Sequence, residues 1–440
     1  MMALKTYTLN NRLSYQTQIF LKKLLSPLSG LVREAGLLYR SSRSPRVVSI
    51  GGDLTGMHIL LKKSHPGQGA YHIGATGFDV NDALIKTLGE SVERYAQLIS
   101  EISGRLPILF SSFDALIESN QGKALSRHQL NPFSINQYTQ KNFPLQPYQN
   151  QSLGWIQLHS LASHKKIWVP AQFILVGYQI KKNKGEPWIS PAVTTGTAAH
   201  SDPIKALLNA TLELIQIDSA MGHWYSSRTA KRIQWDKRVR GVEGILKKQH
   251  YFSHKKYAFY YLENPDLLGF SIACVYTNEA TVPRVAIGLG SDTSLSKALY
   301  KAYLEALGVV GLARMVETSE DATACYDLNG NVGYYASGKD FSFIQHKFSS
   351  IEIAASDLPP DLTGSDTQQL QTLIQSFKQS NKELLFCDLT CSEAIDVGLV
   401  VPRVWSPDTL SLCLPSAPPM NHARYFNYGG ISHSRPHPYP

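Results

Sequence analysis

The chain has 440 residues, of which 43% are apolar, 10% are aromatic and 18% are charged. This composition supports a sizeable folded core and excludes a chain that is disordered throughout. No stretch approaches the roughly 20 apolar residues of a membrane-spanning helix, and the first residues lack the apolar core of a secretory signal. The formal net charge is +9, and the five cysteines are too few and odd in number for a disulfide framework. We therefore expect a cytoplasmic protein that does not associate with membranes.

Composition divides the chain into a basic N-terminal segment, residues 1–50, and a larger domain, residues 51–440. The N-terminal segment holds eight basic residues against Glu34 alone. Within the larger domain, residues 119–151 are rich in Asn, Gln and Pro and predict a polar surface excursion. A Pro-rich break follows at residues 356–365, and an amphipathic helix at 370–377. A pair of apolar strands is predicted within residues 384–405, and a tail without periodicity covers residues 414–440.

Basic residues gather at residues 1–50 and again at residues 229–257, where nine Lys and Arg stand against two acids. Such patches attract polyanions, acidic peptides or acidic proteins, although a solvated surface is the commoner explanation. No helix-turn-helix, zinc finger or aromatic RNA-binding signature accompanies them, so we do not expect nucleic acid to be the partner. A nucleic-acid binder stays open as an alternative that would explain the net charge.

The most informative feature is an internal repeat. Three eight-residue segments begin with Ala-Leu, carry Lys or Asn at the fourth position and end on Glu: residues 83–90, 206–213 and 298–305. Each follows a Gly-containing turn and a residue that commonly caps a helix, namely Asp79, Asp202 and Ser294. The sequence therefore predicts three turn–helix units, each with a glutamate at the same height. The spacings between them are too unequal for a solenoid.

The second of these helices is apolar nearly all round, as in a buried helix. A polar stripe of Asn209, Glu213 and Gln216 interrupts it at i, i+4 and i+7. A buried carboxylate must be paired or must bind a cation, because an isolated charge in the interior is costly. Glu213 is therefore a candidate ligand, and Asp218 just beyond it is a weaker one.

Charged residues also interrupt the first and third helices. One face of the first helix carries polar and charged residues, namely Lys86, Glu90, Glu93, Arg94 and Gln97. One stripe of the third helix carries Lys301 and Glu305. Carboxylates together with cationic and amide side chains suit a site for magnesium and phosphate. The alternative is a structural cluster of ion pairs between packed helices. Neither a Walker A sequence nor a kinase Gly-rich loop is present.

At these residues the chain resembles the YcaO family. The turn at residues 74–77 followed by LGESVERY resembles the family's glycine turn and ExxER signature, and residues 190–218 and 287–306 resemble its second and third ATP-binding segments. The resemblance covers about residues 50–440. It implies an α+β fold of the YcaO type, in which mixed and antiparallel sheets pack with helices and a pseudo-repeat of turn–helix units surrounds an ATP site.

The resemblance also implies roles for particular residues, with ATP and Mg²⁺ as cofactors. The metal ligands would be Glu90, Glu93 and Glu213. The nucleotide would be lined or supported by Thr76, Lys86, Arg94, Asn209, Gln216, Lys301 and Glu305. The chain departs from common family patterns at some of these positions, because some members carry Lys at the place of Thr76, Ser at that of Lys86 and Arg at that of Lys301.

The sequence ends with prolines at alternate positions, Pro436, Pro438 and Pro440. Such a segment favours an extended path because proline fixes the backbone and lacks an N–H. By resemblance, this ending is that of the azoline-forming cyclodehydratases of the family, whose C-terminus reaches the active site. The three prolines are therefore candidate catalytic residues, with the Pro440 carboxylate moving a proton.

The resemblance implies a reaction in which a Cys, Ser or Thr side chain of a ribosomal precursor peptide attacks the preceding amide. Its oxygen is then phosphorylated by ATP and lost as phosphate, leaving a thiazoline or oxazoline. We identify no leader-binding module beside the YcaO-like segments, so we expect a separate E1-like partner, and we also expect a homodimer and a flavin dehydrogenase in the same pathway. A thioamide-forming enzyme and a non-catalytic peptide-binding scaffold with a degraded ATP site remain the alternatives.

Overall fold

The computed structural model describes residues 13–38, 45–62, 72–119, 122–248, 256–316 and 328–440. Parts of the basic N-terminal segment, part of the basic region at 229–257 and Cys325 lie outside these ranges. The other four cysteines are buried and free. Among the described residues, no helix is both long enough and apolar enough to cross a membrane.

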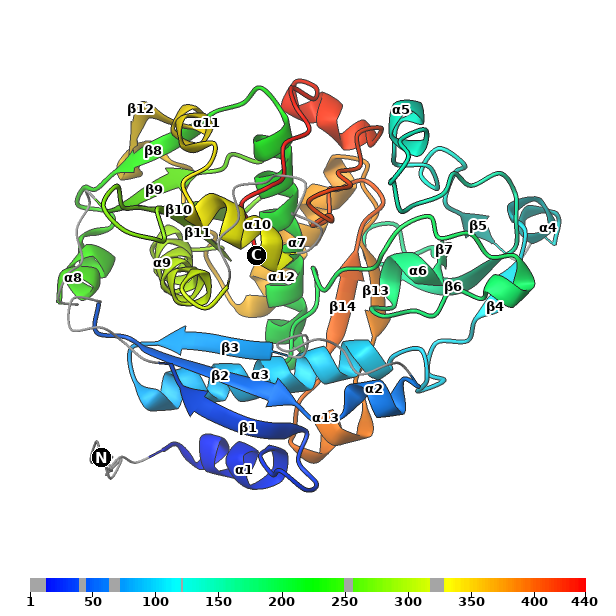
Figure 1. Ribbon diagram of the computed structural model, residues 1–440, viewed down its shortest axis with the longest axis horizontal. Helices are drawn as coiled ribbons and strands as arrows, with labels where there is room; N and C mark the ends of the chain where they lie inside the picture. Colours follow the sequence, from blue (N-terminus) through cyan, green and yellow to red (C-terminus); the bar gives the residue numbers. More distant parts are fainter. Residues whose placement is uncertain (1–12, 39–44, 63–71, 120–121, 249–255, 317–327) are drawn as a thin grey trace.

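A three-stranded antiparallel sheet of β1 (Val32–Leu37), β2 (Val48–Leu54) and β3 (His72–Gly77) lies at the lower edge of the molecule in Figure 1. Helix α3 (Val80–Ile99) packs on this sheet, and α1 (Tyr15–Leu24) packs on α3. The Thr17 hydroxyl on α1 donates to Asn81 Oδ1 on α3 at 2.8 Å. The short helix α2 (Met57–Leu60) follows β2.

The second sheet has the order β11-β10-β9-β8-β12, and its neighbours are antiparallel except for β12 and β8. Its strands are β8 (Ala230–Gln234), β9 (Tyr257–Tyr261), β10 (Phe270–Thr277), β11 (Val285–Asp292) and β12 (Phe348–Ala354). Helix α9 (Leu295–Ala313) packs on one face and α7 (Pro203–Tyr225) on the other, since alternate residues of β10 join two different apolar clusters. Helices α8 (Arg240–Lys248), α10 (Leu328–Ala336) and α11 (Phe341–Lys347) complete this part.

The third sheet has the order β14-β13-β6-β7-β5, with β4 also paired to β6. Its strands are β4 (Leu109–Ser111), β5 (Lys123–Ala124), β6 (Leu153–Ser160), β7 (Lys166–Pro170), β13 (Leu385–Asp388) and β14 (Pro402–Trp405). Helices α4 (Phe113–Glu118), α5 (Ile135–Tyr138), α6 (Ala171–Ile174), α12 (Asp366–Gln379) and α13 (Ser392–Asp396) surround it. Helix α7 lies between the second sheet and the pair formed by α12 and β14 (Figure 1). The predicted α+β fold is confirmed.

The polar excursion packs on the segment that follows β14. Phe133 and Leu145 form a small buried cluster with Ala417, and Gln137 Nε2 donates to the Pro418 carbonyl at 2.7 Å. The excursion is therefore anchored by both apolar and polar contacts, although its composition predicts only a surface loop.

The three predicted helices are present as α3, α7 and α9, but only the segment before α7 is a turn or loop. The turns predicted at residues 74–77 and 288–291 are wrong, because these residues belong to strands β3 and β11 and pair with neighbouring strands. Asp79 and Asp202 cap their helices, and their side chains accept hydrogen bonds from first-turn N–H groups. Ser294 occupies the third N-cap position, but its side chain donates instead to Asp361. Asp361 Oδ1 accepts from the Leu295 N–H at 3.2 Å and so replaces the missing cap.

Glycines allow α9 to lie directly on β11. A Cβ atom placed on Gly288 would come within 2.0 Å of the Ala306 nitrogen, and one placed on Gly290 within 2.3 Å of the Ala302 nitrogen. Any larger residue at these two positions would push the helix away from the strand. This close approach fixes the height of α9, and with it that of Glu305, relative to the sheet.

A fully buried ion pair anchors the C-terminal half of α7. Asp218 Oδ2 lies 2.6 Å from Arg424 Nη2, and neither side chain is exposed. The Tyr428 hydroxyl donates to the same carboxylate, and Asp266 approaches Arg424 from the other side. Asp218 therefore serves the fold, and its weak candidacy as a metal ligand is not supported by its position.

We expect Asp218→Ala to lower the free energy of unfolding by about 3 kcal/mol, because it leaves the Arg424 guanidinium buried without its main partner. Urea denaturation would measure the loss. Glu263→Ala is the matched control, since its pair with Lys231 is exposed and should contribute at most about 1 kcal/mol. Equal losses in the two variants would contradict the assignment.

Candidate functional site

The glutamates of the first two units accept hydrogen bonds from glycine N–H groups in the segments that precede their helices. The Gly74 N–H donates to Glu90 Oε2 at 3.2 Å, and the Gly196 N–H donates to Glu213 Oε2 at 3.1 Å. In the sequence each glycine stands 16 or 17 residues before its glutamate, as Gly288 stands before Glu305. The repeat is therefore a structural unit that sets the height of one carboxylate per helix.

The segment 194–200 bridges α3, α7 and β14. Its Gly196 and Thr197 N–H groups donate to Glu213, and its Ala199 N–H donates to Glu93. Its other edge forms β-bridges from Thr197 to Arg403 and from His200 to Val400. This one segment therefore brings the carboxylates of two helices together.

Gly196 is required at its position. It adopts a φ of +83°, and a Cβ atom there would lie 2.2 Å from the Val404 carbonyl oxygen. The same close approach allows the Val404 N–H to donate to the Gly196 carbonyl at 2.7 Å. A side chain would displace the turn from β14 and remove an N–H donor from Glu213.

Burial disfavours the ionised form of these carboxylates, and at Glu93 the neighbouring like charges add to this effect. Burial raises the pKa of Glu93 well above the ordinary glutamate value, and the neighbouring charges of Glu213 and then Glu90 raise it further. Burial also raises the pKa of Glu213 to about 7, against the lowering effects of the N–H donors and Arg403. Glu93 and Glu213 therefore lie close enough that the negative charge of Glu213 raises the pKa of Glu93.

Two guanidinium groups face the carboxylates. Arg94 Nη2 lies 3.8 Å from Glu90 Oε1, with both side chains about a third exposed. Arg403 is 1% exposed, and its charge acts on both Glu213 and Glu93. Its Nη2 donates to the Val193 carbonyl at 2.6 Å and its Nη1 to Thr197 Oγ1 at 3.3 Å.

The third helix contributes Glu305 and Lys301. Burial raises the pKa of Glu305 to about 7, and Glu90 adds to the rise. Water nevertheless reaches this exposed side chain, which screens both effects, so we give Glu305 less weight than Glu213. Lys301 Nζ pairs with Asp292 Oδ2 at 2.8 Å and donates to the Ser291 carbonyl at 3.0 Å.

The remaining expected nucleotide residues lie around this cluster. Asn209 and Gln216 stand one turn before and one turn after Glu213 on α7, and Asn209 is exposed. Thr76 is buried, and its hydroxyl shares a hydrogen bond with Ser49 at 3.0 Å. Lys86 Nζ lies 3.5 Å from the Thr76 carbonyl, although its ion pair is with Asp82 at 2.9 Å.

The chemistry of this donor set fits a divalent cation. Four carboxylates (Glu90, Glu93, Glu213 and Glu305) stand against the guanidinium groups of Arg94 and Arg403, an excess of two negative charges when all are ionised. In the described part of the chain, no group of three or more acidic, His or Cys side chains is arranged to hold a metal by itself. Mg²⁺ commonly binds through one or two carboxylates together with phosphates and water, so this arrangement suits it.

The C-terminal tail runs into the interior, and Figure 1 shows the C-terminus at the centre of the molecule beside α10 and α7. Asn331 Nδ2 on α10 donates to the carbonyls of His437 and Tyr439 at 2.6 and 2.9 Å. Tyr335 donates to the Pro436 carbonyl at 2.6 Å. Pro438 is buried, whereas Pro440 is partly exposed.

The tail histidines are neutral at physiological pH. Burial lowers the pKa of His433 and of His437 to about 4. His437 Nε2 lies 2.8 Å from the Cys413 carbonyl, and His433 Nε2 lies 2.7 Å from the Trp224 carbonyl. Both rings therefore hold the tail in place.

Sequence reasoning missed three residues of this region. Arg403 stands in the apolar run VGLVVPRVW, where a lone charge was a signal that it is paired in the interior. Asp292 is 8% exposed, pairs with Lys301, and is the last residue of the fully buried strand β11. Asn331 is fully buried against the tail, and no pattern in the sequence pointed to it.

We expect Glu213→Gln to stabilise the protein at pH 8 when nucleotide and Mg²⁺ are absent. The pKa of Glu213 is raised from 4.5 to about 7 on folding, so its ionisation opposes folding above pH 4.5, increasingly up to about pH 7. After allowance for screening, we expect a gain of about 1 kcal/mol at pH 8 and none near pH 4.5. Thermal unfolding across this pH range measures the gain, Glu352→Gln on exposed β12 is the control, and a loss of stability at pH 8 would contradict the account.

A family model described as YcaO cyclodehydratase, ATP- and Mg²⁺-binding, matches residues 74–410. A comparison with curated proteins finds no match. Among solved structures, one described as a heterocyclase in complex with substrate and cofactor has a TM-score of 0.70 at 17% identity, and the match covers 95% of this chain but only 56% of that chain.

Two further solved structures match over most of their length. YcaO of Methanopyrus kandleri, bound with AMPPCP and Mg²⁺, has a TM-score of 0.59 at 15% identity and covers 86% of each chain. The E. coli microcin synthetase McbBCD complex has a TM-score of 0.59 at 12% identity, with 94% of this chain and 98% of that chain covered. That complex has also been solved with pro-MccB17 bound. At these identities the structural likeness concerns the fold alone. The family model matches most of the sequence, and the chain therefore belongs to the YcaO family of ATP- and Mg²⁺-binding proteins.

Proposed function

We propose that the protein is an ATP-dependent cyclodehydratase that converts Cys, Ser or Thr residues of a ribosomal precursor peptide to thiazolines or oxazolines. One observation carries the proposal: the C-terminal tail, with His437, Pro438 and Tyr439 buried, packs close to the α7 and Arg403 side of the carboxylate cluster. Tyr439 of the tail packs in the apolar cluster that contains Ile217 and touches Val193. Val193 in turn accepts a hydrogen bond from Arg403, which faces Glu213.

In this proposal Glu90, Glu93 and Glu213 hold Mg²⁺ against the phosphates. The cation would supply charge stabilisation to the phosphoryl group during its transfer. Ligation would also keep Glu93 and Glu213 ionised, because it replaces their mutual repulsion with attraction. The cluster therefore gains stability from a bound cation that it lacks without one.

The remaining expected residues would position the nucleotide. Arg94, Asn209, Gln216 and Glu305 lie within or beside the carboxylate cluster and would line it. Lys301 is held by Asp292 and would act at the edge of the site. Thr76 has no charge to offer, and the nearby Lys86 ammonium would take over an electrostatic role there.

The reaction proceeds on the substrate. A Cys, Ser or Thr side chain attacks the carbonyl carbon of the preceding amide and forms a five-membered ring. The resulting oxyanion takes the terminal phosphoryl group of ATP, and loss of this oxygen as phosphate leaves the C=N bond of the azoline. For each ring the peptide loses one water, and ATP becomes ADP and phosphate. The protein supplies position and charge stabilisation.

The Pro440 carboxylate would move protons between the attacking side chain, the amide nitrogen and solvent. Pro436 and Pro438 would serve by keeping the last residues extended, since proline fixes its own backbone. The hydrogen bonds of Asn331 and Tyr335 to the tail support this path. Hydrogen bonds to the rest of the protein already restrict the tail, so it loses little further conformational entropy when the substrate binds.

The proposed partners follow from the chemistry and from the neighbours. A precursor peptide is the substrate, and a separate E1-like protein would deliver it, as the E. coli neighbour belongs to a complex. A flavin dehydrogenase would oxidise azolines in the same pathway. We further propose a homodimer and, because ATP and free thiols are used, a cytoplasmic location.

We expect Glu90→Ala and Glu213→Ala each to weaken Mg²⁺-dependent binding of AMPPCP at least tenfold, because each removes a carboxylate from the cation site. Isothermal titration with and without Mg²⁺ would measure this binding. Glu393→Ala on α13 is the control, since its carboxylate binds the Tyr95 hydroxyl. Mg²⁺-dependent binding that survives in both variants would contradict the assignment of Glu90 and Glu213 as metal ligands. A wild-type protein that does not bind AMPPCP would favour a scaffold with a degraded site.

We expect an extra glycine after Pro440 to abolish azoline formation, because it displaces the terminal carboxylate, while Pro440→Ala retains most activity. The measurement is the ATP-dependent loss of one water per ring from the precursor peptide, by mass spectrometry, with the E1-like partner present. AMPPCP binding should be unchanged in both variants. Full activity of the extended protein would refute a role for the terminal carboxylate, and products with sulfur in place of oxygen would instead identify a thioamide-forming enzyme.

A further inference from the structure

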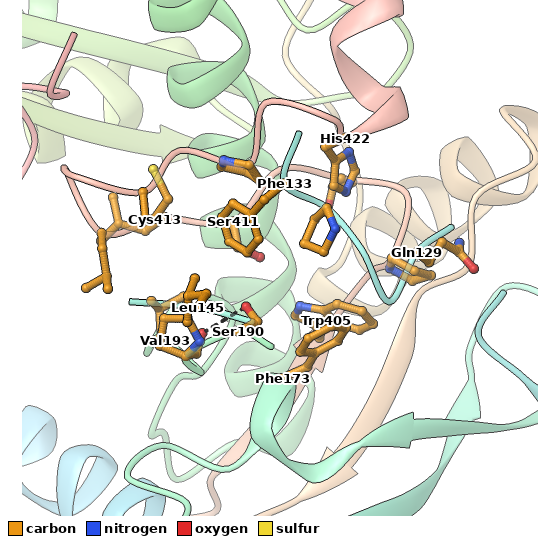
Figure 2. Close-up of a pocket in the computed structure, with 18 residues that line it drawn as sticks. Gln129, Phe133, Leu145, Phe173, Ser190, Val193, Trp405, Ser411, Cys413 and His422 are labelled. Carbon is orange, nitrogen blue, oxygen red and sulfur yellow. Dashed lines mark hydrogen bonds between the residues drawn. The ribbon is translucent and has the colours of Figure 1, made fainter. Parts of the chain in front are cut away.

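An apolar pocket, partly open to solvent, lies where three distant segments meet, and the centre of a water molecule can occupy about 80 Å³ of it. Figure 2 shows Val193 and Ser190 from the segment before α7, Trp405 at the end of β14, and Ser411 and Cys413 from the segment that follows. The polar excursion at 119–151 adds Phe133 and Leu145. The excursion, which no step of the proposed reaction uses, therefore forms one wall of a binding pocket.

No residue that lines the pocket carries a charge at neutral pH. Its aromatic wall includes Phe173 and Trp405, whose ring centroids lie 5.7 Å apart. Its only titratable ring is that of His422, and burial lowers the pKa of this group to about 4. His422 Nδ1 already accepts from the Arg424 N–H at 3.1 Å. The pocket therefore suits an uncharged, apolar or aromatic group.

A hydrogen bond links the pocket wall to an arginine that faces the carboxylate cluster. Its lining residue Val193 accepts a hydrogen bond from Arg403 at 2.6 Å, and the Arg403 charge acts on Glu213 and Glu93. The Arg403 side chain therefore connects the pocket wall to two of the carboxylates that would hold the cation in the proposed function.

The pocket touches the tail on another side. The carbonyl of its lining residue Cys413 lies 2.8 Å from His437 Nε2. Cys413 also belongs to the apolar cluster that contains Tyr439. A group seated in the pocket would thus have the carboxylate cluster and the tail as its neighbours.

The wall of the pocket contains one buried hydroxyl, that of Thr409, without a hydrogen-bond partner among the described residues. Thr409 is 2% exposed. A buried hydroxyl without a partner is unfavourable. A peptide N–H or C=O entering beside the apolar side chain would satisfy it.

We propose that this pocket receives the side chain of the substrate residue that immediately precedes the ring-forming Cys, Ser or Thr, and selects a large apolar or aromatic residue there. The assignment rests on the proposed function, in which the carbonyl of that preceding residue accepts the phosphoryl group. The carbonyl of this preceding residue must face the carboxylate cluster. The side chain of the same residue can then reach the part of the pocket wall that Val193 forms. The excursion at 119–151 then determines part of the substrate specificity.

The test compares two capped peptides, N-acetyl-Phe-Cys-Gly-amide and N-acetyl-Ala-Cys-Gly-amide, by titration into the full-length protein with Mg²⁺ and AMPPCP. We expect the Phe peptide to bind at least tenfold more tightly, because a benzyl group buries more apolar area than a methyl group. Ser411→Phe should bring the ratio close to one while AMPPCP binding is unchanged. Ser29→Phe, on an exposed turn far from the pocket in sequence, should leave the ratio as in the wild type.

Thr409→Val provides a second variant that keeps the shape of the side chain. We expect it to raise the thermal midpoint of the free protein and to weaken both peptides by a similar factor, about threefold to tenfold, because both lose the same backbone hydrogen bond. Equal binding of the two peptides to the wild type, or a ratio that persists in Ser411→Phe, would overturn the pocket assignment even if azolines form. A preserved tenfold ratio, together with no azoline formation from the precursor peptide with ATP and the E1-like partner present, would overturn the proposed function instead and leave the pocket assignment standing.

Discussion

The site depends on backbone N–H groups that hold like charges together. Glu93 and Glu213 come from different helices, and the segment 194–200 donates to both. The same segment is fixed from behind by its bridges to Arg403 and Val400. Without these donors, burial and repulsion would drive the two carboxylates apart or leave both protonated. The arrangement is therefore poised to take a cation and stays unfavourable without one.

Other parts of the molecule compensate for this local cost. Helix α7 carries both Glu213 and, more than one turn later, Asp218, whose buried pair with Arg424 is fully satisfied. The same helix packs against the second sheet on one side and α12 on the other. Its position is thus set by contacts unrelated to the cation site. The C-terminal segment contributes Arg424, a wall of the apolar pocket and the tail, so it connects stability, substrate binding and the proposed proton transfer.

Local chemistry made the helices and their glutamates predictable. Asp79 and Asp202 cap their helices as expected from their positions before apolar periodicity, and the repeat aligned Glu90, Glu213 and Glu305. The same residues carried the resemblance to the YcaO family, and the family model and the structural comparison confirm the family and its fold. The polar stripe on α7 pointed to Glu213, whose pKa burial raises to about 7, and its role as a metal ligand stays a prediction.

Long-range contacts could not be predicted in this way. The pairing of Thr197 with Arg403 joins residues about 200 positions apart, and no local pattern encodes it. The contact of the excursion with Ala417 and the hydrogen bonds of Asn331 to the tail also join residues far apart in the sequence. Both depend on which surfaces meet after the sheets have formed, which propensity and periodicity do not specify.

The most direct test of the central claim is a crystal structure of the protein with AMPPCP and Mn²⁺, with data collected at the manganese absorption edge. The account predicts an anomalous peak within coordination distance of oxygens from at least two of Glu90, Glu93 and Glu213, with the phosphates on its other side. A manganese ion bound elsewhere, with the three carboxylates paired only to arginines and backbone, would show that the cluster is a structural ion-pair network.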